Sequence, residues 1–188
     1  APTLMSIALG GDDKPPLTDD LVARYHRVLM ESPDVISDLE RKRGWTKQTM
    51  VRIGMGWDGS HFWLPIRRFH DKALVNARMY DPFKRTRVKS FHYANESGVK
   101  RVTVWLPFGV ESVQDSDEVW WFEGEPDGIL AAQMGFPAAL ITGGSGTWTD
   151  EALAVQGKRR AVICYDMDSR GRKGARVVAR RFRAAGID

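Results

Sequence analysis

The second half of the chain alternates short apolar runs with segments of helical periodicity, and this alternation limits the possible folds more than any other feature. The apolar runs lie at residues 118–122, 138–142 and 160–165, and the helical segments that follow them lie at 126–134, 150–155 and 171–185. Strands that alternate with helices are typical of βαβ units, in which the strands run parallel. The pattern therefore predicts an α/β fold with a parallel sheet.

Two of these apolar runs stop abruptly at carboxylates. Glu123 follows residues 119–122, and Asp166 and Asp168 follow residues 162–165. The carboxyl ends of strands form the ligand crevice of an open parallel sheet, so we expect the three acids to meet there. Asp166 and Asp168 stand at positions i and i+2, which face the same side in extended backbone. Hard divalent cations take oxygen ligands, so the three acids predict a metal site suited to chemistry on phosphates.

Each acidic or glycine-rich segment also has a plainer interpretation. Glu123 can be an exposed loop acid, and an Asp-x-Asp sequence occurs in many ordinary loops. Glu125 and Asp127 begin the next helix, and we interpret both as compensating the helix dipole. The loop at 143–146 can approach a phosphate or form a flexible turn. It lacks the Lys-Ser/Thr ending of a P-loop and the spacing of a dinucleotide-binding loop, which disfavours both sites.

The charge distribution indicates a polyanionic partner. The 188 residues hold 28 Lys and Arg against 24 Asp and Glu, a formal net charge of +4. Between residues 158 and 183 the basic residues are opposed only by Asp166 and Asp168. Basic side chains beside a carboxylate cluster suit a polyanion held near metal ions, and a solvated Arg-rich helix face is the alternative.

Other function classes are disfavoured. No apolar run approaches the length of about 18 residues that a membrane-spanning helix needs, so no membrane partner is expected. Cys164 is the single cysteine, which fits a reduced cytoplasmic setting. The four histidines show no zinc-ligand spacing with it, and no Gly-x-Ser-x-Gly element of an α/β-hydrolase is present.

The first half of the chain predicts a smaller, mixed α+β subdomain. Helices are expected from the Thr18 cap to Leu29, at 33–43 and at 46–51, and strands at 61–66, 73–79 and 101–106, with a turn at 57–60 and an exposed loop at 81–98. We therefore divide the chain into a leader (1–17), an α+β subdomain (18–110) and a parallel-sheet domain (111–188).

The two acidic strand ends resemble the Toprim domain shared by DnaG-type primases, type IA and II topoisomerases and some nucleases. Residues 122–127 are similar to the strand-ending glutamate motif of that family, and residues 166–175 are similar to the primase form of its Asp-x-Asp motif. The Glu-Gly-Glu-Pro-Asp wording is closer to phage and mitochondrial-type primase-helicases. In the first half, five segments resemble motifs of the primase polymerase core and follow one another in the same order. They are residues 39–45, 62–66, 75–78, 88–93 and 106–109.

The resemblance implies the catalytic core of a DNA primase, with a Toprim parallel-sheet domain preceded by a smaller mixed α+β subdomain. Such an enzyme synthesises short RNA primers on single-stranded DNA from nucleoside triphosphates. Glu123, Asp166 and Asp168 would be the catalytic residues and would bind Mg²⁺ or Mn²⁺. The implied nucleotide or nucleic-acid contacts are Arg78, Lys89, Arg170, Arg172 and Lys173.

The resemblance also implies a cellular context. A replicative helicase is expected in the same chain or as a separate partner, in the cytoplasm of a bacterial cell or of a phage-infected host. No Cys/His zinc module precedes the matching residues, and the sequence stops at residues 186–188, where the family continues into a strand with a further acidic motif. We therefore expect a fragment that is truncated within its Toprim domain.

Two other functions stay open. A Toprim nuclease would use the same acids to cleave DNA, and the ordered motifs of the first half disfavour it. A non-catalytic nucleic-acid-binding module with a degenerate site is disfavoured by the presence of Glu123, Asp166 and Asp168.

Overall fold

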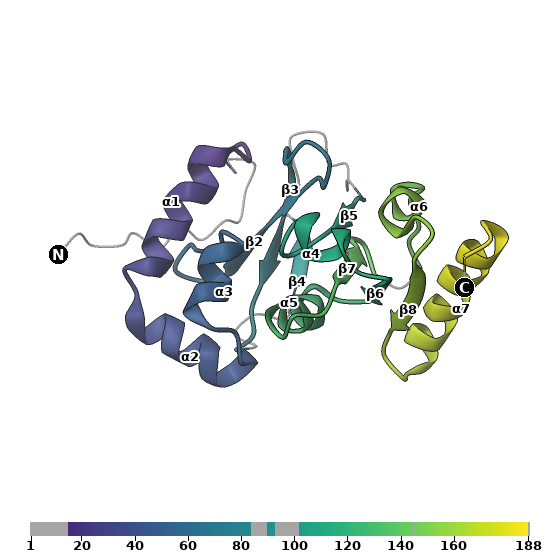
Figure 1. Cartoon of the computed structure of the whole chain (residues 1–188). Coiled ribbons are helices and arrows are strands. Elements are labelled where there is room, and N and C mark those ends of the chain that lie inside the picture. Colours follow the sequence, from purple (N-terminus) through teal and green to yellow (C-terminus); the bar gives the residue numbers. More distant parts are fainter. Residues whose placement is uncertain (1–14, 84–89, 93–101, 145, 188) are drawn as a thin grey trace.

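The structure, a computed structural model, describes residues 15–83, 90–92, 102–144 and 146–187. Its N-terminal part is an antiparallel sheet with helices packed against it (Figure 1). The helices are α1 (Asp19–Met30), α2 (Pro33–Arg43) and α3 (Lys47–Arg52), and the strands are β1 (Gly56–Trp57), β2 (Phe62–Arg67), β3 (Leu74–Tyr80) and β4 (Ser90–His92). The four strands pair in the order β1-β2-β3-β4.

The predicted stop and start signals explain the bounds of these helices. The Thr18 hydroxyl caps α1 by accepting a hydrogen bond from the backbone N–H of Leu21 at 3.2 Å. Gly44 ends α2 with a φ of 72°, a left-handed conformation that glycine adopts without steric cost. Thr46 caps α3 through the N–H of Thr49 at 3.2 Å.

The C-terminal part is a second, mostly parallel sheet that contains the predicted βαβ units. Its elements are β5 (Val104–Trp105), α4 (Glu111–Gln114), β6 (Glu118–Phe122), α5 (Glu125–Gln133), β7 (Ala138–Ile141), α6 (Glu151–Gln156), β8 (Arg160–Cys164) and α7 (Ser169–Ala184). The strands pair in the order β5-β7-β6-β8. β6 runs parallel to both β7 and β8, whereas β5 is antiparallel to β7. The predicted α/β class, with a parallel sheet after a mixed α+β part, is confirmed.

Two details of the sequence prediction were wrong. The segment predicted as an exposed loop at 81–98 contains β4, which pairs with β3, and it begins with the fully buried Asp81. The turn predicted at 57–60 begins one residue too early, because Trp57 belongs to β1 and is buried. Aromatic residues suit strands, and here the indole of Trp57 packs on the ring of Phe62 at 4.6 Å between centroids.

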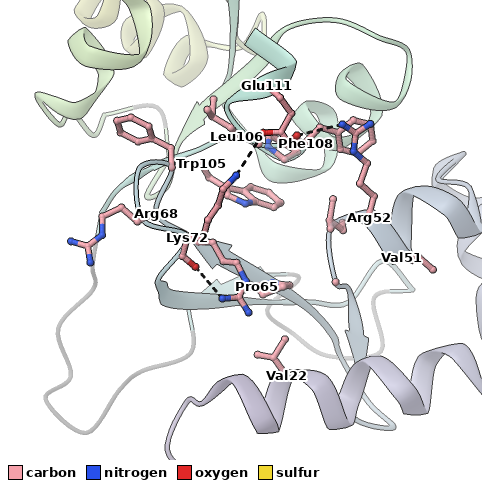
Figure 2. Close-up of a pocket in the computed structure, with 16 residues that line it drawn as sticks. Val22, Val51, Arg52, Pro65, Arg68, Lys72, Trp105, Leu106, Phe108 and Glu111 are labelled. Atoms are coloured by element: carbon pink, nitrogen blue, oxygen red, sulfur yellow. Dashed lines mark hydrogen bonds and ion pairs between the residues drawn. The ribbon is translucent and has the colours of Figure 1, made fainter. Parts of the chain in front are cut away.

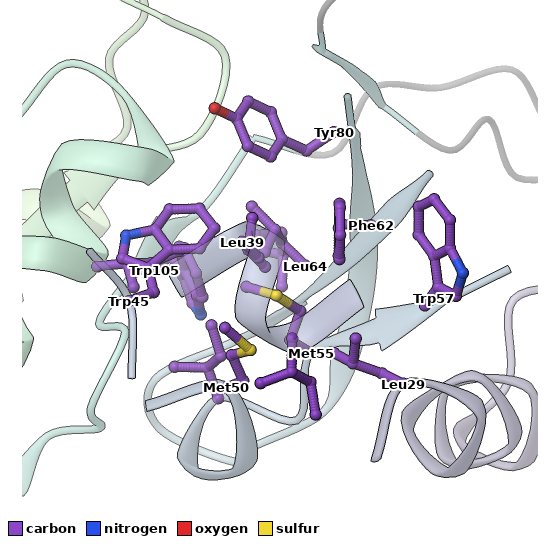
Figure 3. Close-up of a cluster of buried hydrophobic side chains, with 14 of the residues drawn as sticks. Leu29, Leu39, Trp45, Met50, Met55, Trp57, Phe62, Leu64, Tyr80 and Trp105 are labelled. Atoms are coloured by element: carbon purple, nitrogen blue, oxygen red, sulfur yellow. The ribbon is translucent and has the colours of Figure 1, made fainter. Parts of the chain in front are cut away.

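The largest hydrophobic core crosses the predicted boundary at residue 110. It contains side chains from the N-terminal helices and sheet, among them Trp45, Phe62 and Leu64, and it continues into Ile129 of α5 and Leu140 of β7 (Figure 3). The two parts therefore share buried apolar surface, and the free energy of burying it favours one fixed arrangement of the two sheets.

The parallel sheet carries helices on both faces. Val119 and Trp121 of β6 point to a second core that includes Val178 and Phe182 of α7. Phe122, the residue after Trp121, points to the opposite face and packs with residues of α5. This period-two alternation covers both faces of the sheet and leaves the ends of its strands as the exposed edges. None of the described helices is long and apolar enough to cross a membrane.

Candidate active site

The two acidic turns lie side by side at one edge of the parallel sheet. β6 and β8 are neighbouring parallel strands whose last residues, Phe122 and Cys164, are paired in register. The side chain of Glu123 reaches across to the second turn, where its Oε2 lies 3.4 Å from the backbone nitrogen of Asp166. The fold therefore brings together strand ends that lie 43 residues apart in the sequence.

The turn after β8 presents its carboxylates to solvent. Asp166 and Asp168 are exposed, and Met167 between them is 78% exposed. Asp168 also caps α7, because its Oδ1 accepts a hydrogen bond from the N–H of Gly171 at 2.7 Å. This hydrogen bond holds one carboxylate oxygen of Asp168 at the start of α7, and it also restricts the direction in which the other oxygen points.

Gly171 allows the turn to fold back on the first turn of α7. A methyl group at this position would overlap the backbone carbonyl oxygen of Asp166, so only glycine fits. The guanidinium of Arg172 donates to the carbonyl oxygen of Met167 and holds the turn from the other side. These contacts fix the backbone that carries Asp166 and Asp168.

The side chains at this edge are of the type that binds divalent cations. Carboxylate oxygens from both turns border the same edge, and hard cations such as Mg²⁺ and Mn²⁺ prefer such ligands. Across the described residues, no group of three or more His, Cys, Asp or Glu side chains is gathered closely enough to hold a metal ion. The assignment of Glu123, Asp166 and Asp168 as metal ligands stays a prediction.

Glu125 plays a different part from the one predicted. It is only 5% exposed, and its Oε1 lies 3.4 Å from Nε of Arg78 on β3. The distance defines an ion pair, although its geometry does not make a hydrogen bond, and Nε of Arg78 has no hydrogen-bond partner among the described residues. Compensation of the helix dipole, which the sequence suggested, does not account for this burial. Glu125 links the part of the chain that holds the parallel sheet to the N-terminal sheet.

A contact between a cation and an aromatic ring joins α2 to the same strand, β3. The guanidinium of Arg43 stacks over the ring of Tyr80, with 5.0 Å from its Cζ to the ring centroid. Burial lowers the pKa of Arg43, and the nearby Asp127 carboxylate partly offsets that effect. Nε of Arg43 and the hydroxyl of Tyr80 also lack hydrogen-bond partners in the described part of the chain. Sequence reasoning missed Arg43 and Tyr80 as polar groups of this junction.

The predicted basic residues fall into two groups. Arg170 lies at the acidic edge, where its Nη2 would come within 3.4 Å of a methyl group added to Gly144 in the 143–146 loop. Arg172 and Lys173 are exposed on the first turn of α7. Arg78 lies apart from them, at the junction with Glu125. Lys89 falls outside the described residues.

The two residues that precede Asp166 have raised pKa values. Burial raises the pKa of the Tyr165 phenol to about 12, and the negative charge of Glu123 adds to the effect. Burial likewise raises the pKa of the Cys164 thiol. Both groups therefore remain neutral near pH 7, and the negative charge at this edge comes from the carboxylates alone.

Comparison with known protein families finds a match for the C-terminal part of the chain. Residues 120–188 match the family model described as Toprim-like. This part of the chain is thus similar to Toprim-like domains. A comparison with curated proteins finds no match.

Solved structures extend the likeness across the N-terminal part. A structure described as the DnaG catalytic core superposes with a TM-score of 0.66 at 18% identity, over 85% of this chain and 64% of the other. The Escherichia coli primase catalytic core gives 0.65 at 17% identity, over 85% and 64%. The zinc-binding and RNA polymerase domains of the Aquifex aeolicus primase give 0.71 at 15% identity, over 89% and 51%.

These comparisons show the fold over most of the chain. It is the fold of a DnaG-type primase catalytic core, with a Toprim-like domain as its second part. The chain spans less than two thirds of the length of these structures.

Proposed function

We propose that this chain is the core of a DNA primase, which joins ribonucleotides into short primers on a single-stranded DNA template. The observation that carries the proposal is the extent of the fold likeness. It covers 85% of the chain and so includes the N-terminal sheet as well as the Toprim-like part. A Toprim nuclease would need only the second part, so the likeness of both favours a primase.

The three acids form the metal-binding site of the proposed enzyme. Glu123, Asp166 and Asp168 would bind Mg²⁺ or Mn²⁺, which would activate the attacking 3′-hydroxyl and neutralise the triphosphate. Asp168 is held by its hydrogen bond to Gly171, and Asp166 by the turn that packs on that glycine. Their carboxylates are thereby oriented before substrate binds, which lowers the cost of organising the site.

The basic residues would hold the polyanionic substrates. Arg170, Arg172 and Lys173 begin α7, next to the acids, and we assign them to phosphates of the incoming nucleotide or of the template. Arg78 and Lys89 would contact template or nucleotide from the N-terminal part. One of the similar structures is described as a DnaG primase catalytic domain bound to single-stranded DNA, which supports this class of partner.

The wider context belongs to the same proposal. A replicative helicase, in the same polypeptide or separate, would place the primase at a replication fork. The wording of the first acidic motif favours a phage or primase-helicase type, acting in the cytoplasm of a bacterium or an infected host.

Primer synthesis on a single-stranded template tests the proposal. Labelled nucleoside triphosphates are incubated with Mn²⁺ or Mg²⁺ and either residues 1–188 or the full natural protein. We expect new short RNA, and we expect Asp166→Asn and Glu123→Gln to reduce synthesis by about 100-fold or more, because metal ligation is worth several kcal/mol in such transfers.

The matched control is Asp117→Asn. Asp117 is an exposed acid at the start of β6, so the change removes the same charge at the opposite edge of the same sheet. It should leave synthesis unchanged. Strand scission without RNA synthesis would identify a Toprim nuclease instead, and DNA binding with neither reaction would identify a non-catalytic module.

A further inference from the structure

A cavity of about 310 Å³ lies away from the acidic turns, where four segments of the chain meet (Figure 2). Its lining comes from Val22 of α1, from the end of α3 and the turn after it (51–54), from the β2–β3 hairpin (65–72) and from the link between β5 and α4 (105–111). None of these residues is among the predicted site residues, so the cavity has no part in the proposed reaction.

Strand directions place this cavity at the opposite edge of the molecule. β5 is antiparallel to β7, so the chain leaves Trp105 toward the start of β7, whereas the acids follow the ends of the parallel strands β6 and β8. On the N-terminal side the hairpin precedes β3, whereas Arg78 near the end of β3 meets Glu125 beside the acidic edge. A ligand in the cavity would therefore not touch the acids.

The cavity has an apolar part and a cationic mouth. Trp105 and Leu106 are buried in the wall, and Val51 is 49% exposed, an unusual degree for a valine on a helix. The charged residues that line it are four cations and one carboxylate: Arg52, Arg67, Arg68, Lys72 and Glu111. An apolar pocket with a cationic rim suits an apolar group flanked by negative charges.

Carboxylates already reach three of the four cations. Nζ of Lys72 lies 3.6 Å from Glu111, Nη2 of Arg68 lies 3.0 Å from Asp71, and Arg67 pairs with Asp19. These pairs are exposed, and such pairs contribute only about 0–1 kcal/mol each, so a carboxylate from a partner can replace one at little cost.

Arg52 is the cation left for a partner. Within the described part of the chain it has no carboxylate at ion-pair distance, although its charge is among those that lower the pKa of Glu111. Its guanidinium lies 3.9 Å above the ring of Phe108. The guanidinium Nη2 donates to the backbone carbonyl of Phe108 at 3.5 Å. A planar guanidinium held in this way is ready to bind a carboxylate with its remaining N–H groups.

The backbone of Lys72 adds a second indication of function. Its φ is 60°, and it is the single described non-glycine residue with a positive φ. A side chain in this region is strained, and such strain persists where the surroundings enforce it. Here it holds the ammonium group of Lys72 at the cavity mouth opposite Glu111 (Figure 2).

The aromatic residues disfavour a nucleic-acid base as the ligand. Stacking needs an open aromatic face. Trp105 is 3% exposed, and the ring of Phe108 is already covered by Arg52. Phe69, the third aromatic residue of the lining, is partly buried and packs against the second core. We propose that the cavity docks a short acidic segment of a partner protein, with one apolar side chain in the pocket and carboxylates on Arg52 and Lys72. This proposal does not depend on the polymerase activity.

Fluorescence anisotropy with a labelled model peptide tests the docking site. The peptide carries aspartates on both sides of a single leucine. We expect weak, salt-sensitive binding, and we expect replacement of the leucine by serine to weaken it about tenfold, because burying a leucine is worth about 1.5–3 kcal/mol. Equal binding of the two peptides would contradict an apolar anchor.

Protein variants locate the site. The double change Arg52→Gln with Lys72→Gly removes two cations and relieves the strained backbone, so the protein should stay folded while the peptide binds about tenfold more weakly. Val51→Thr should weaken binding about threefold, since it places a hydroxyl in an apolar wall. The control Lys158→Gln removes an exposed charge elsewhere and should change binding less than twofold.

Three results would overturn the inference. One is a double variant that, with an unchanged melting temperature, binds the peptide as tightly as Lys158→Gln does. Another is the absence of any peptide binding at low salt. The third is displacement of the peptide by an oligothymidylate whose own binding the double variant weakens equally, because the cavity would then be a nucleic-acid subsite.

Discussion

The turn after β6 and the turn after β8 occupy equivalent places in the parallel sheet, yet they use their carboxylates in opposite ways. In the first turn, Glu125 is buried and pairs with Arg78 across the boundary between the two sheets. In the second, Asp166 and Asp168 stay exposed, and the backbone around Gly171 is the tightly packed part. The position of a strand end thus determines where the acids lie, and residues distant in the sequence determine which of the acids are exposed to solvent.

The largest effect on stability is expected from Gly171→Ala. The added methyl group would overlap the carbonyl oxygen of Asp166, and rigid backbone must then move, so we expect a loss of about 3 kcal/mol or more in the free energy of unfolding. Urea denaturation measures the loss.

Gly146→Ala is the control for this change. A methyl group at Gly146 would meet no atom within 4 Å, and its φ is not in the left-handed region, so the change should cost nothing. Equal stability of the two variants would show that the second turn does not pack on α7.

A smaller loss is expected from Glu125→Ala. Removing one partner of a buried ion pair leaves the other charge without compensation, at a cost of about 3–5 kcal/mol when both are fully buried. Arg78 is 19% exposed, so we expect about 2 kcal/mol. A double-mutant cycle with Arg78→Ala should give a coupling energy above about 0.5 kcal/mol.

Two exposed acids serve as controls for Glu125. Asp127→Ala in the same turn and Asp166→Ala in the other should each change the free energy of unfolding by less than about 0.5 kcal/mol. If Glu125→Ala were as mild as these, the two turns would not differ in the way described.

The contrast between the turns also shows how far the sequence can predict this molecule. Local signals predicted most elements closely, because caps such as Thr18 and Thr46 and the period-two pattern of β6 act within a few residues. The meeting of Glu123 with the second turn was also predictable, since parallel strands end at a common edge.

The partners of the first turn were not predictable in the same way. A glutamate at the start of a helix looks the same in sequence whether it faces solvent or is buried. What buries Glu125 is Arg78, which lies on a different sheet. The stacking of Arg43 on Tyr80 likewise joins α2 to β3 through tertiary packing alone. The first contact depends on how the two sheets meet, and the second depends on how α2 packs on the N-terminal sheet. No local pattern carries information about either.

The last prediction, which shows only above pH 10, connects the two turns through Tyr165. Burial and the Glu123 charge raise the phenol pKa to about 12, whereas an unfolded tyrosine titrates near 10. Below pH 10 both states are protonated and the stabilisation is fully present. Between about pH 10 and 12 the unfolded state loses its proton first, so stability falls as the pH rises.

Comparison of wild type with Tyr165→Phe isolates this contribution. The difference between their free energies of unfolding should be constant below pH 10 and should shift against the wild type above it. In Glu123→Gln the like charge is absent, so the phenolate absorbance of Tyr165 should appear at lower pH than in the wild type. Superimposable absorbance titrations for the two proteins would mean that Glu123 does not act on Tyr165. The carboxylate of the first turn would then lie too far from the second turn to share a cation with Asp166.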